Sequence, residues 1–138
     1  MGDQCYVNLT FRNREAAAAF GKASEERDEF WNEVNGDDEF QFAVGVEECN
    51  YAWSSQMDTA AAAGVEFLGS HESGGDYPKE DFVTKNGEVI YAETGDGGYV
   101  VPVEVSSDGK VSISAGAKLQ LEDFIAAENA LRAKWSAT

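Results

Sequence analysis

Positive charge is scarce in this chain. Its 138 residues include 10 lysines and arginines against 26 aspartates and glutamates, which gives a formal net charge of −16 at pH 7. Binding to nucleic acid depends on basic side chains that neutralise phosphates, and attraction to an anionic membrane surface has the same electrostatic origin. The composition therefore argues against direct contact with nucleic acid or membrane and favours a partner that is itself basic.

Signals for metal binding and membrane insertion are also sparse. The chain has one histidine, His71, and two cysteines, Cys5 and Cys49, which lie far apart in the sequence with no CxxC or Cys/His spacing. We expect no metal site and no cofactor, and we expect both cysteines to be small buried residues rather than a disulfide. No apolar run approaches the roughly 18 residues of a membrane span, and the first residues lack the pattern of a signal peptide. A cytoplasmic protein is the default expectation.

What the chain does contain is enough apolar sequence for a core, since 43% of its residues are hydrophobic and 12% are aromatic. That supply suits one domain of this length, which we expect to span residues 1–138. Two segments alternate between apolar and polar residues with the period of a strand that buries one face, the first from Cys5 to Phe11 and the second from Phe40 to Val46.

Shorter strand-like runs follow in the second half of the chain. They lie at Val65 to Phe67, at 80–85 and 88–93, from Tyr99 to Val105, and from Val111 to Ile113, with residues 69–78 expected as a loop. Asn86-Gly87 separates two of these runs and predicts a type I′ hairpin. Asp108-Gly109 predicts a second hairpin, and Pro102 places its strand at an edge.

Helical patterns occupy the remaining segments. Asn13 is the predicted N-cap of a helix that starts at Arg14 and keeps an apolar face as far as Val34, either as one helix or as two that break near Gly21. Ser55 is the predicted cap of a short helix that ends at Gly64. A last amphipathic helix is expected from about Lys118 to Trp135.

Strands with one polar face, joined by hairpins and followed by helices, predict an α+β fold. We expect a mostly antiparallel sheet with helices packed on one face. The order of the expected elements is that of an elaborated ferredoxin-like sandwich.

Part of the chain resembles a known family. The string AWSSQMDTAAAAGVEFLGSHESGGDY, followed by NGEVIYAETGDGG, places an aromatic before a short helix, a small residue before a strand, and a glycine-rich hairpin ahead of a glycine turn. These features, with Asn8 in the opening strand, are similar to the ferredoxin-like domain family of phage and plasmid proteins (YubB-like). The resemblance implies a mobile-element origin and assigns no activity to particular residues.

The histidine is the strongest candidate for chemistry. His71 stands beside Glu72, with further carboxylates downstream, so a metal site or a histidine–carboxylate base can be drawn. With one histidine and no second motif, the sequence favours a solvent-exposed loop histidine. The glycine-rich loops lack the residues of a phosphate loop and are predicted to be turns.

The remaining candidates are weaker still. Paired carboxylates are too abundant among 26 acids to indicate a glycosidase, so we assign no catalytic residue. Trp31 and Trp135 fall on helix faces expected in the core, whereas Trp53 is expected to be exposed.

The acidic residues fall into two blocks. Residues 15–48 carry 11 acidic and 2 basic side chains, residues 66–104 carry 9 and 2, and residues 105–138 are neutral. Carboxylates on the solvent face of a strand are roughly 6.6 Å apart, a spacing comparable to that of phosphates along nucleic acid. The pattern suggests nucleic-acid mimicry, and with it an acidic phage or mobile-element protein that inhibits a host nucleic-acid-binding defence complex of the anti-CRISPR or anti-restriction type.

This hypothesis assigns partner binding to acids of both blocks, and whether the two blocks share one face is left to the structure. The predicted residues are Glu25, Glu26, Glu29, Glu33, Asp37, Asp38, Glu39, Glu72, Asp76, Glu80 and Asp81. The alternatives are a small ferredoxin-like enzyme or ligand-binding domain that uses the His71 loop, and a plain or salt-adapted acidic soluble domain. The sequence leaves the oligomeric state open.

Overall fold

The structure is a computed structural model that describes residues 4–24, 32–37, 42–75 and 77–137, with the backbone alone described for 32–37. Its strands are β1 (Gln4–Phe11), β2 (Asn32–Asp37), β3 (Phe42–Asn50), β4 (Leu68–His71), β5 (Glu80–Lys85), β6 (Glu88–Gly95), β7 (Gly98–Tyr99), β8 (Val103–Val105) and β9 (Val111–Ile113). Its helices are α1 (Arg14–Ser24), α2 (Ser54–Ala62) and α3 (Ala115–Ser136), and a 3₁₀ turn, η2 (Tyr51–Trp53), precedes α2.

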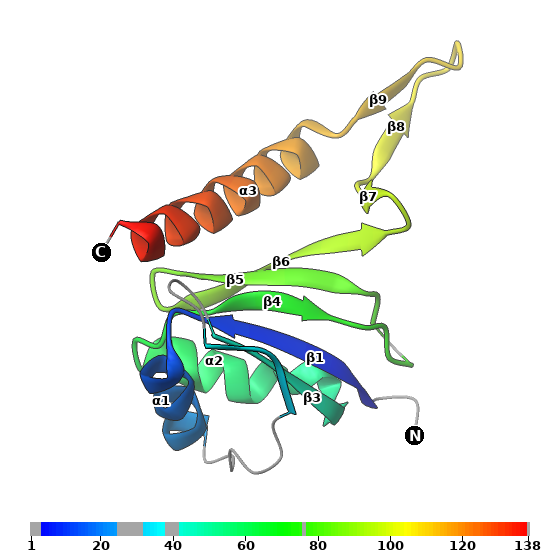
Figure 1. Ribbon diagram of the computed structural model, residues 1–138. Coiled ribbons are helices and arrows are strands. Elements are labelled where there is room, and N and C mark those ends of the chain that lie inside the picture. Colours follow the sequence, from blue (N-terminus) through cyan, green and yellow to red (C-terminus); the bar gives the residue numbers. More distant parts are fainter. Residues whose placement is uncertain (1–3, 25–31, 38–41, 76, 138) are drawn as a thin grey trace.

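One antiparallel sheet organises the molecule. Within the described residues its strand order is β2-β3-β1-β4-β5-β6-β7, and every neighbouring pair is antiparallel. From β1 to β4 the elements follow the order β-α-β-β-α-β, with β3 placed between β1 and β2, which is consistent with a ferredoxin-like core. The α+β class and the antiparallel sheet are confirmed. The β8–β9 hairpin stands apart from the sheet and projects away from it (Figure 1).

Helices cover both faces of the sheet. α1 and α2 lie on one face, and α3 lies on the other (Figure 1). The prediction that the helices pack on one face holds for α1 and α2 and is wrong for α3. The cause lies in β5, where adjacent residues point to opposite faces: Phe82 enters the α1–α2 core, and Val83 packs beneath α3.

The α1–α2 core is built around aromatic rings. Phe20 of α1 meets Phe67 edge-on, with ring centroids 5.2 Å apart, and stacks on Trp53 at 6.0 Å. Trp53 is therefore 7% exposed, and the prediction that it is exposed is wrong. Aromatic pairs of this kind contribute roughly 0.5–1.5 kcal/mol beyond the area they bury. Packing against Phe20 therefore outweighs the polar character of the sequence around Trp53.

The α3 core is smaller. Phe124, Leu131 and Trp135 are buried against Leu68 and Val83. This confirms the expected core position of Trp135, although α3 begins at Ala115, earlier than predicted.

Polar contacts connect α3 to the rest of the molecule. They are an ion pair between Lys85 Nζ and Asp123 Oδ1 at 2.5 Å, another between Lys134 Nζ and Glu66 Oε2 at 2.8 Å, and a hydrogen bond from Arg12 to the Trp135 carbonyl at 3.2 Å. Both ion pairs are exposed, so each contributes no more than about 1 kcal/mol.

Three local signals are confirmed by geometry. Asn13 Oδ1 accepts a hydrogen bond from the Ala16 amide at 2.9 Å, as an N-cap does at the start of a helix. After α2, Gly64 has φ +93°, and the amides of Gly64 and Val65 donate back to the carbonyls of Ala61 and Ala60. Asn86 and Gly87 both have positive φ, 53° and 80°, as a type I′ turn requires.

The first predicted helix is too long. α1 ends at Ser24 and runs through the buried Gly21 without a break, and residues 32–37 form β2 instead of continuing the helix to Val34. β2 pairs with β3 at the edge of the sheet, with a register shift between Glu33 and Gly36. Pairing with a neighbouring strand therefore overrides the helical spacing of the apolar residues in this segment.

Other helix and strand boundaries also differ from the predicted ones. α2 starts at Ser54 with Trp53 at the N-cap position, so Ser55 lies inside the helix and does not cap it. The strand predicted at Val65 to Phe67 lies later in the chain, at Leu68–His71, so the predicted loop at 69–78 begins too early. The predicted strand from Tyr99 to Val105 is divided around Pro102 into β7 and β8, since proline donates no backbone hydrogen bond to a ladder.

Candidate functional site

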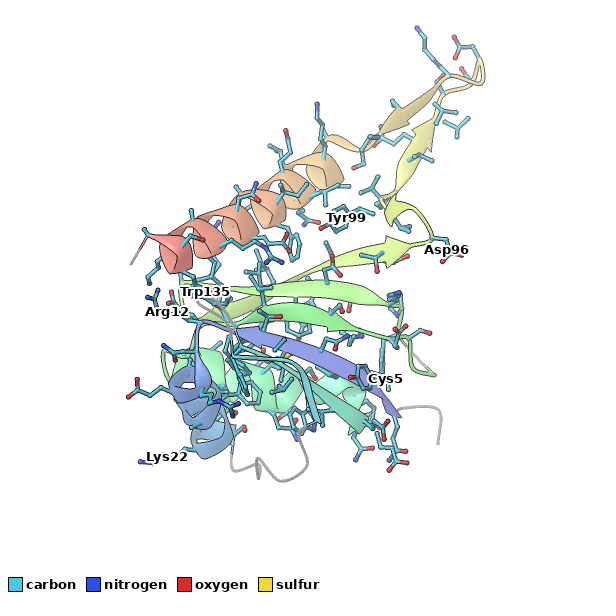
Figure 2. All side chains as sticks on the ribbon, viewed as in Figure 1. Cys5, Arg12, Lys22, Asp96, Tyr99 and Trp135 are labelled. Atoms are coloured by element: carbon cyan, nitrogen blue, oxygen red, sulfur yellow. The ribbon has the colours of Figure 1, made fainter. Side chains whose placement is uncertain are left out.

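Carboxylates from several strands meet at one end of the sheet. Strand pairing brings the end of β3, the end of β4, the start of β5 and the end of β6 together there, because His71 pairs with Glu80 and Glu80 pairs with Glu93. We call this region the acidic end, and it comprises Glu47, Glu48, Glu72, Glu80, Asp81, Glu93 and Asp96. Figure 2 shows Asp96 and Cys5 at this end and Arg12 and Lys22 at the other.

Basic residues are concentrated at the opposite end. Arg12 follows β1, Lys85 closes β5 beside the Asn86-Gly87 turn, and Lys134 reaches Glu66 near the end of α3. At the acidic end, Lys79 Nζ lies 3.8 Å from Glu72 Oε2, and both side chains are about half exposed. The sheet is therefore electrostatically polarised along its strands, and the acidic end keeps a strong excess of negative charge.

The structure unites part of the predicted partner-binding set. Glu72, Glu80 and Asp81 belong to the acidic end. Glu33 and Asp37 lie on β2, the neighbour of β3, where Glu33 pairs with Val44 and Asp37 pairs with Phe42 at the opposite end of the sheet. Six other predicted residues lie outside the described part of the chain: Glu25, Glu26, Glu29, Asp38, Glu39 and Asp76.

Four members of the acidic end were not among the predicted site residues: Glu47, Glu48, Glu93 and Asp96. The patterns that predicted strands near β3 and β6 also indicated where their ends lie. The antiparallel register that aligns those ends was not readable from the sequence.

His71 lies at the centre of this region and is buried, with 3% of its surface exposed, so the prediction of a solvent-exposed loop histidine is wrong. It is the last residue of β4, held between β1 and β5. Its Nδ1 lies 2.8 Å from the Glu72 carbonyl oxygen and its Nε2 lies 3.0 Å from Glu80 Oε1. Both partners are acceptors, so the geometry suits a ring that donates from both nitrogens.

The pKa of His71 reflects these contacts. Burial disfavours the charged ring and lowers the pKa, but the hydrogen bonds to Glu80 and to the Glu72 carbonyl and the negative charges of both residues outweigh it. The net effect raises the pKa of His71 above its usual value. Both ring nitrogens are occupied, so His71 organises the site rather than presenting a free lone pair to a substrate.

A hollow of about 320 Å³ opens beside the His71–Glu80 pair. Its lining residues come from η2, α2, β4, β5, β6 and the loop after β4, and are Tyr51, Ala52, Ser54, Asp58, His71, Tyr77, Glu80 and Tyr91. The ring of Tyr77 lies 5.6 Å from that of His71, and the ring of Tyr91 lies 6.2 Å from it. The hollow thus combines aromatic walls with two carboxylates.

The hydroxyl of Tyr91 is buried and has no hydrogen-bond partner among the described residues. Burial and the nearby charges of Asp58 and Glu80 raise the pKa of Tyr91, so the phenol remains neutral. A buried hydroxyl without a partner costs roughly 1–3 kcal/mol.

The rim of the hollow carries backbone strain. Tyr51, Ala52 and Trp53 have φ of 52°, 54° and 57°, three successive residues in the left-handed region. Each such residue costs about 1–2 kcal/mol when it is not glycine. Strain of this kind persists where the surrounding structure fixes it and is concentrated at binding sites. Tyr51, which is 59% exposed, lines the hollow.

Within the described ranges, no group of three or more His, Cys, Asp or Glu side chains is placed to hold a metal ion. None of the helices in those ranges combines the length and apolar character needed to cross a bilayer. No family model, curated protein or solved structure matches the chain. The resemblance to the YubB-like family therefore stays a prediction.

Proposed function

We propose that this protein binds a basic, nucleic-acid-binding surface of another protein through the acidic end of its sheet, and that it inhibits that partner by occupying the surface. The observation that supports this most is the convergence of seven carboxylates from separate strands and turns at one end of a chain whose net charge is −16. Glu47, Glu48, Glu72, Glu93 and Asp96 are exposed there.

The array has suitable dimensions for this role. Neighbouring strands are about 4.8 Å apart, and residues on one face of a strand are roughly 6.6 Å apart, so the ends of β3 to β6 present charges at spacings close to those of a nucleic-acid backbone. A concentrated negative potential also speeds encounter with a positive groove, and salt weakens it.

A finer form of the proposal makes the protein a phage or mobile-element inhibitor of a CRISPR effector or restriction enzyme. It rests on the family resemblance given above and on the charge, and the genes that neighbour this one provide its direct test. The acidic end supports only the coarser form, a basic partner.

Two variants with equal net charge test the proposal. The test variant carries Glu47→Gln, Glu48→Gln, Glu72→Gln and Glu93→Gln, and the control carries Glu15→Gln, Glu88→Gln, Glu104→Gln and Glu122→Gln, all at exposed positions. Affinity capture from host lysate, followed by a nucleic-acid-binding assay of the captured protein, measures the effect. We expect the wild type and the control to capture a nucleic-acid-binding protein and to displace its nucleic acid.

The test variant should capture at least tenfold less, since each lost charge contact weakens binding and every 1.4 kcal/mol is about tenfold. Capture by the wild type should also fall steeply between about 0.1 M and about 1 M salt. Equal capture by both variants, or a captured protein that keeps its nucleic acid, would overturn the proposal.

A further inference from the structure

We infer that the hollow beside His71 is a receptor for the guanidinium group of an arginine side chain. The inference deepens the proposed function and rests on it for its biological setting, because the hollow lies within the acidic end. The hollow itself is a feature of this chain alone. It can be tested with a small arginine derivative and no partner protein.

The lining of the hollow defines a cation site. Asp58 is exposed on α2 and Glu80 belongs to β5, and both carboxylates line the hollow. Glu80 is partly neutralised by its 3.0 Å contact with His71, which leaves Asp58 as the less compensated charge. An anion placed there would be repelled by both carboxylates, whereas a cation is attracted by both.

The walls select among cations. Three tyrosine rings, those of Tyr51, Tyr77 and Tyr91, line the hollow, and the faces of aromatic rings attract cations. Guanidinium is planar, stacks on such rings and is weakly hydrated, whereas the ammonium of lysine is compact and holds its water strongly. A volume of about 320 Å³ accommodates a guanidinium and the methylene groups that carry it.

The unpartnered Tyr91 hydroxyl is the independent observation that points to a ligand. Its oxygen is buried, and its raised pKa keeps it an uncharged phenol whose lone pairs can accept hydrogen bonds. Guanidinium has five N–H donors in a rigid fork, enough to reach Asp58 and the phenol oxygen together. Occupation by arginine would therefore satisfy both the uncompensated charge and the orphaned hydroxyl.

The experiment titrates the full chain with N-acetyl-argininamide, N-acetyl-lysinamide and N-acetyl-citrullinamide, the last being a neutral isostere of the first. Amide chemical shifts and tyrosine fluorescence report binding. We expect the arginine derivative to bind with a Kd on the order of 1 mM, the lysine derivative about tenfold more weakly, and the citrulline derivative not measurably. Equal binding of the arginine and citrulline derivatives, or of the arginine and lysine derivatives, overturns the inference.

Single variants locate the site. Asp58→Asn should weaken arginine binding about tenfold and Tyr91→Phe about fivefold, whereas Glu88→Gln, which removes one charge at the far end of β6, should leave it within twofold. Tyr91→Phe should also unfold at a higher urea concentration, because it removes a buried hydroxyl that lacks a partner. An effect of Glu88→Gln equal to that of Asp58→Asn would mean general charge attraction and would overturn the site.

The quadruple acidic-end variant separates this inference from the proposed function. It keeps Asp58, Glu80 and the three tyrosines, so it should bind the arginine derivative within about twofold of wild type even though it loses the partner. If the wild type binds the arginine derivative but captures no partner, the proposed function is contradicted and the arginine site is supported. If the wild type captures a partner but does not bind the arginine derivative, the arginine site is contradicted and the proposed function is supported.

Discussion

His71 is the residue on which the site depends, and its environment makes the stability of the protein sensitive to pH. The ring is 3% exposed and its pKa is raised, mainly by Glu80 and the Glu72 carbonyl against the opposing effect of burial. The titratable groups around it are Glu80 of β5, Glu72 and Tyr77 of the loop after β4, Tyr91 of β6, Asp58 of α2 and Cys5 of β1.

A raised folded-state pKa sets the sign of the effect. The charged ring stabilises the fold fully below the unfolded pKa, about 6.5, and this stabilisation is lost as pH rises through the folded pKa. We expect the urea midpoint of the wild type to fall across that window. Glu80→Gln should flatten this fall, whereas Glu88→Gln should retain it. Parallel curves for wild type and Glu80→Gln would show that the pair does not couple to folding.

At the scale of elements, the apolar side chains of one strand can be buried while those of another strand are exposed. Val83 of β5 is 0% exposed beneath α3, whereas Val111 of β9 is 63% exposed on the projecting hairpin. Val103, Val105 and Ile113 share that exposure. Their alternation was read correctly as strand, but alternation alone does not say whether a second layer covers the apolar face.

Valine-to-threonine changes at Val83 and Val111 measure how much burial of each side chain contributes to stability. Threonine keeps the shape and the β propensity of valine but replaces one methyl group with a hydroxyl. Val83→Thr buries that hydroxyl and should lower the free energy of unfolding by about 1–3 kcal/mol. Val111→Thr should change it by less than about 0.5 kcal/mol. Urea titrations of both variants provide the check, and equal losses would mean that the hairpin is covered in solution.

The sequence predicted those elements whose signals are local. Alternation located β1 and β3, Asn13 located the start of α1, and Gly64 and Asn86-Gly87 located a helix end and a hairpin. β2 was missed because its strand character comes from pairing with β3. The opposite-face position of α3 was missed because it depends on which residues of β5 meet which layer.

The candidate site was less predictable than the fold for the same reason. His71, Asp58 and Tyr91 come from β4, α2 and β6, and nothing in their sequence spacing brings them together. His71 looked like a loop residue because glycines and polar residues follow it. Its burial results from its neighbours β1 and β5 in the sheet.

At the scale of the whole molecule, the fold distributes the net negative charge unevenly between the two ends of the sheet. The sheet gathers the carboxylates at the ends of β3 to β6 at one end, whereas the other end carries Arg12, Lys85 and Lys134, whose charges offset those of Glu66, Glu88 and Asp123. A partner that approaches through electrostatic attraction therefore meets an oriented surface rather than a uniformly acidic one.

The two cysteines provide a chemical probe of the pairing between β1 and β3. Cys5 and Cys49 are distant in sequence, yet they are register partners on β1 and β3, and both are buried. Residues directly opposite on antiparallel strands have Cα atoms about 4.5–5.5 Å apart, within the range that a disulfide spans. Burial raises the pKa of Cys5, which slows its reaction while the strands are docked.

A mild oxidant should therefore join the two thiols within one chain, seen as a mass lower by two hydrogens, and Cys49→Ala should abolish this product. Closing the loop between them should stabilise the fold by about 4 kcal/mol in the chain-entropy model. Only between-chain disulfides would contradict the register. Since both thiols become buried when β1 docks against β3, the rate at which they lose reactivity toward a thiol reagent after dilution from urea would time the docking of the first strand.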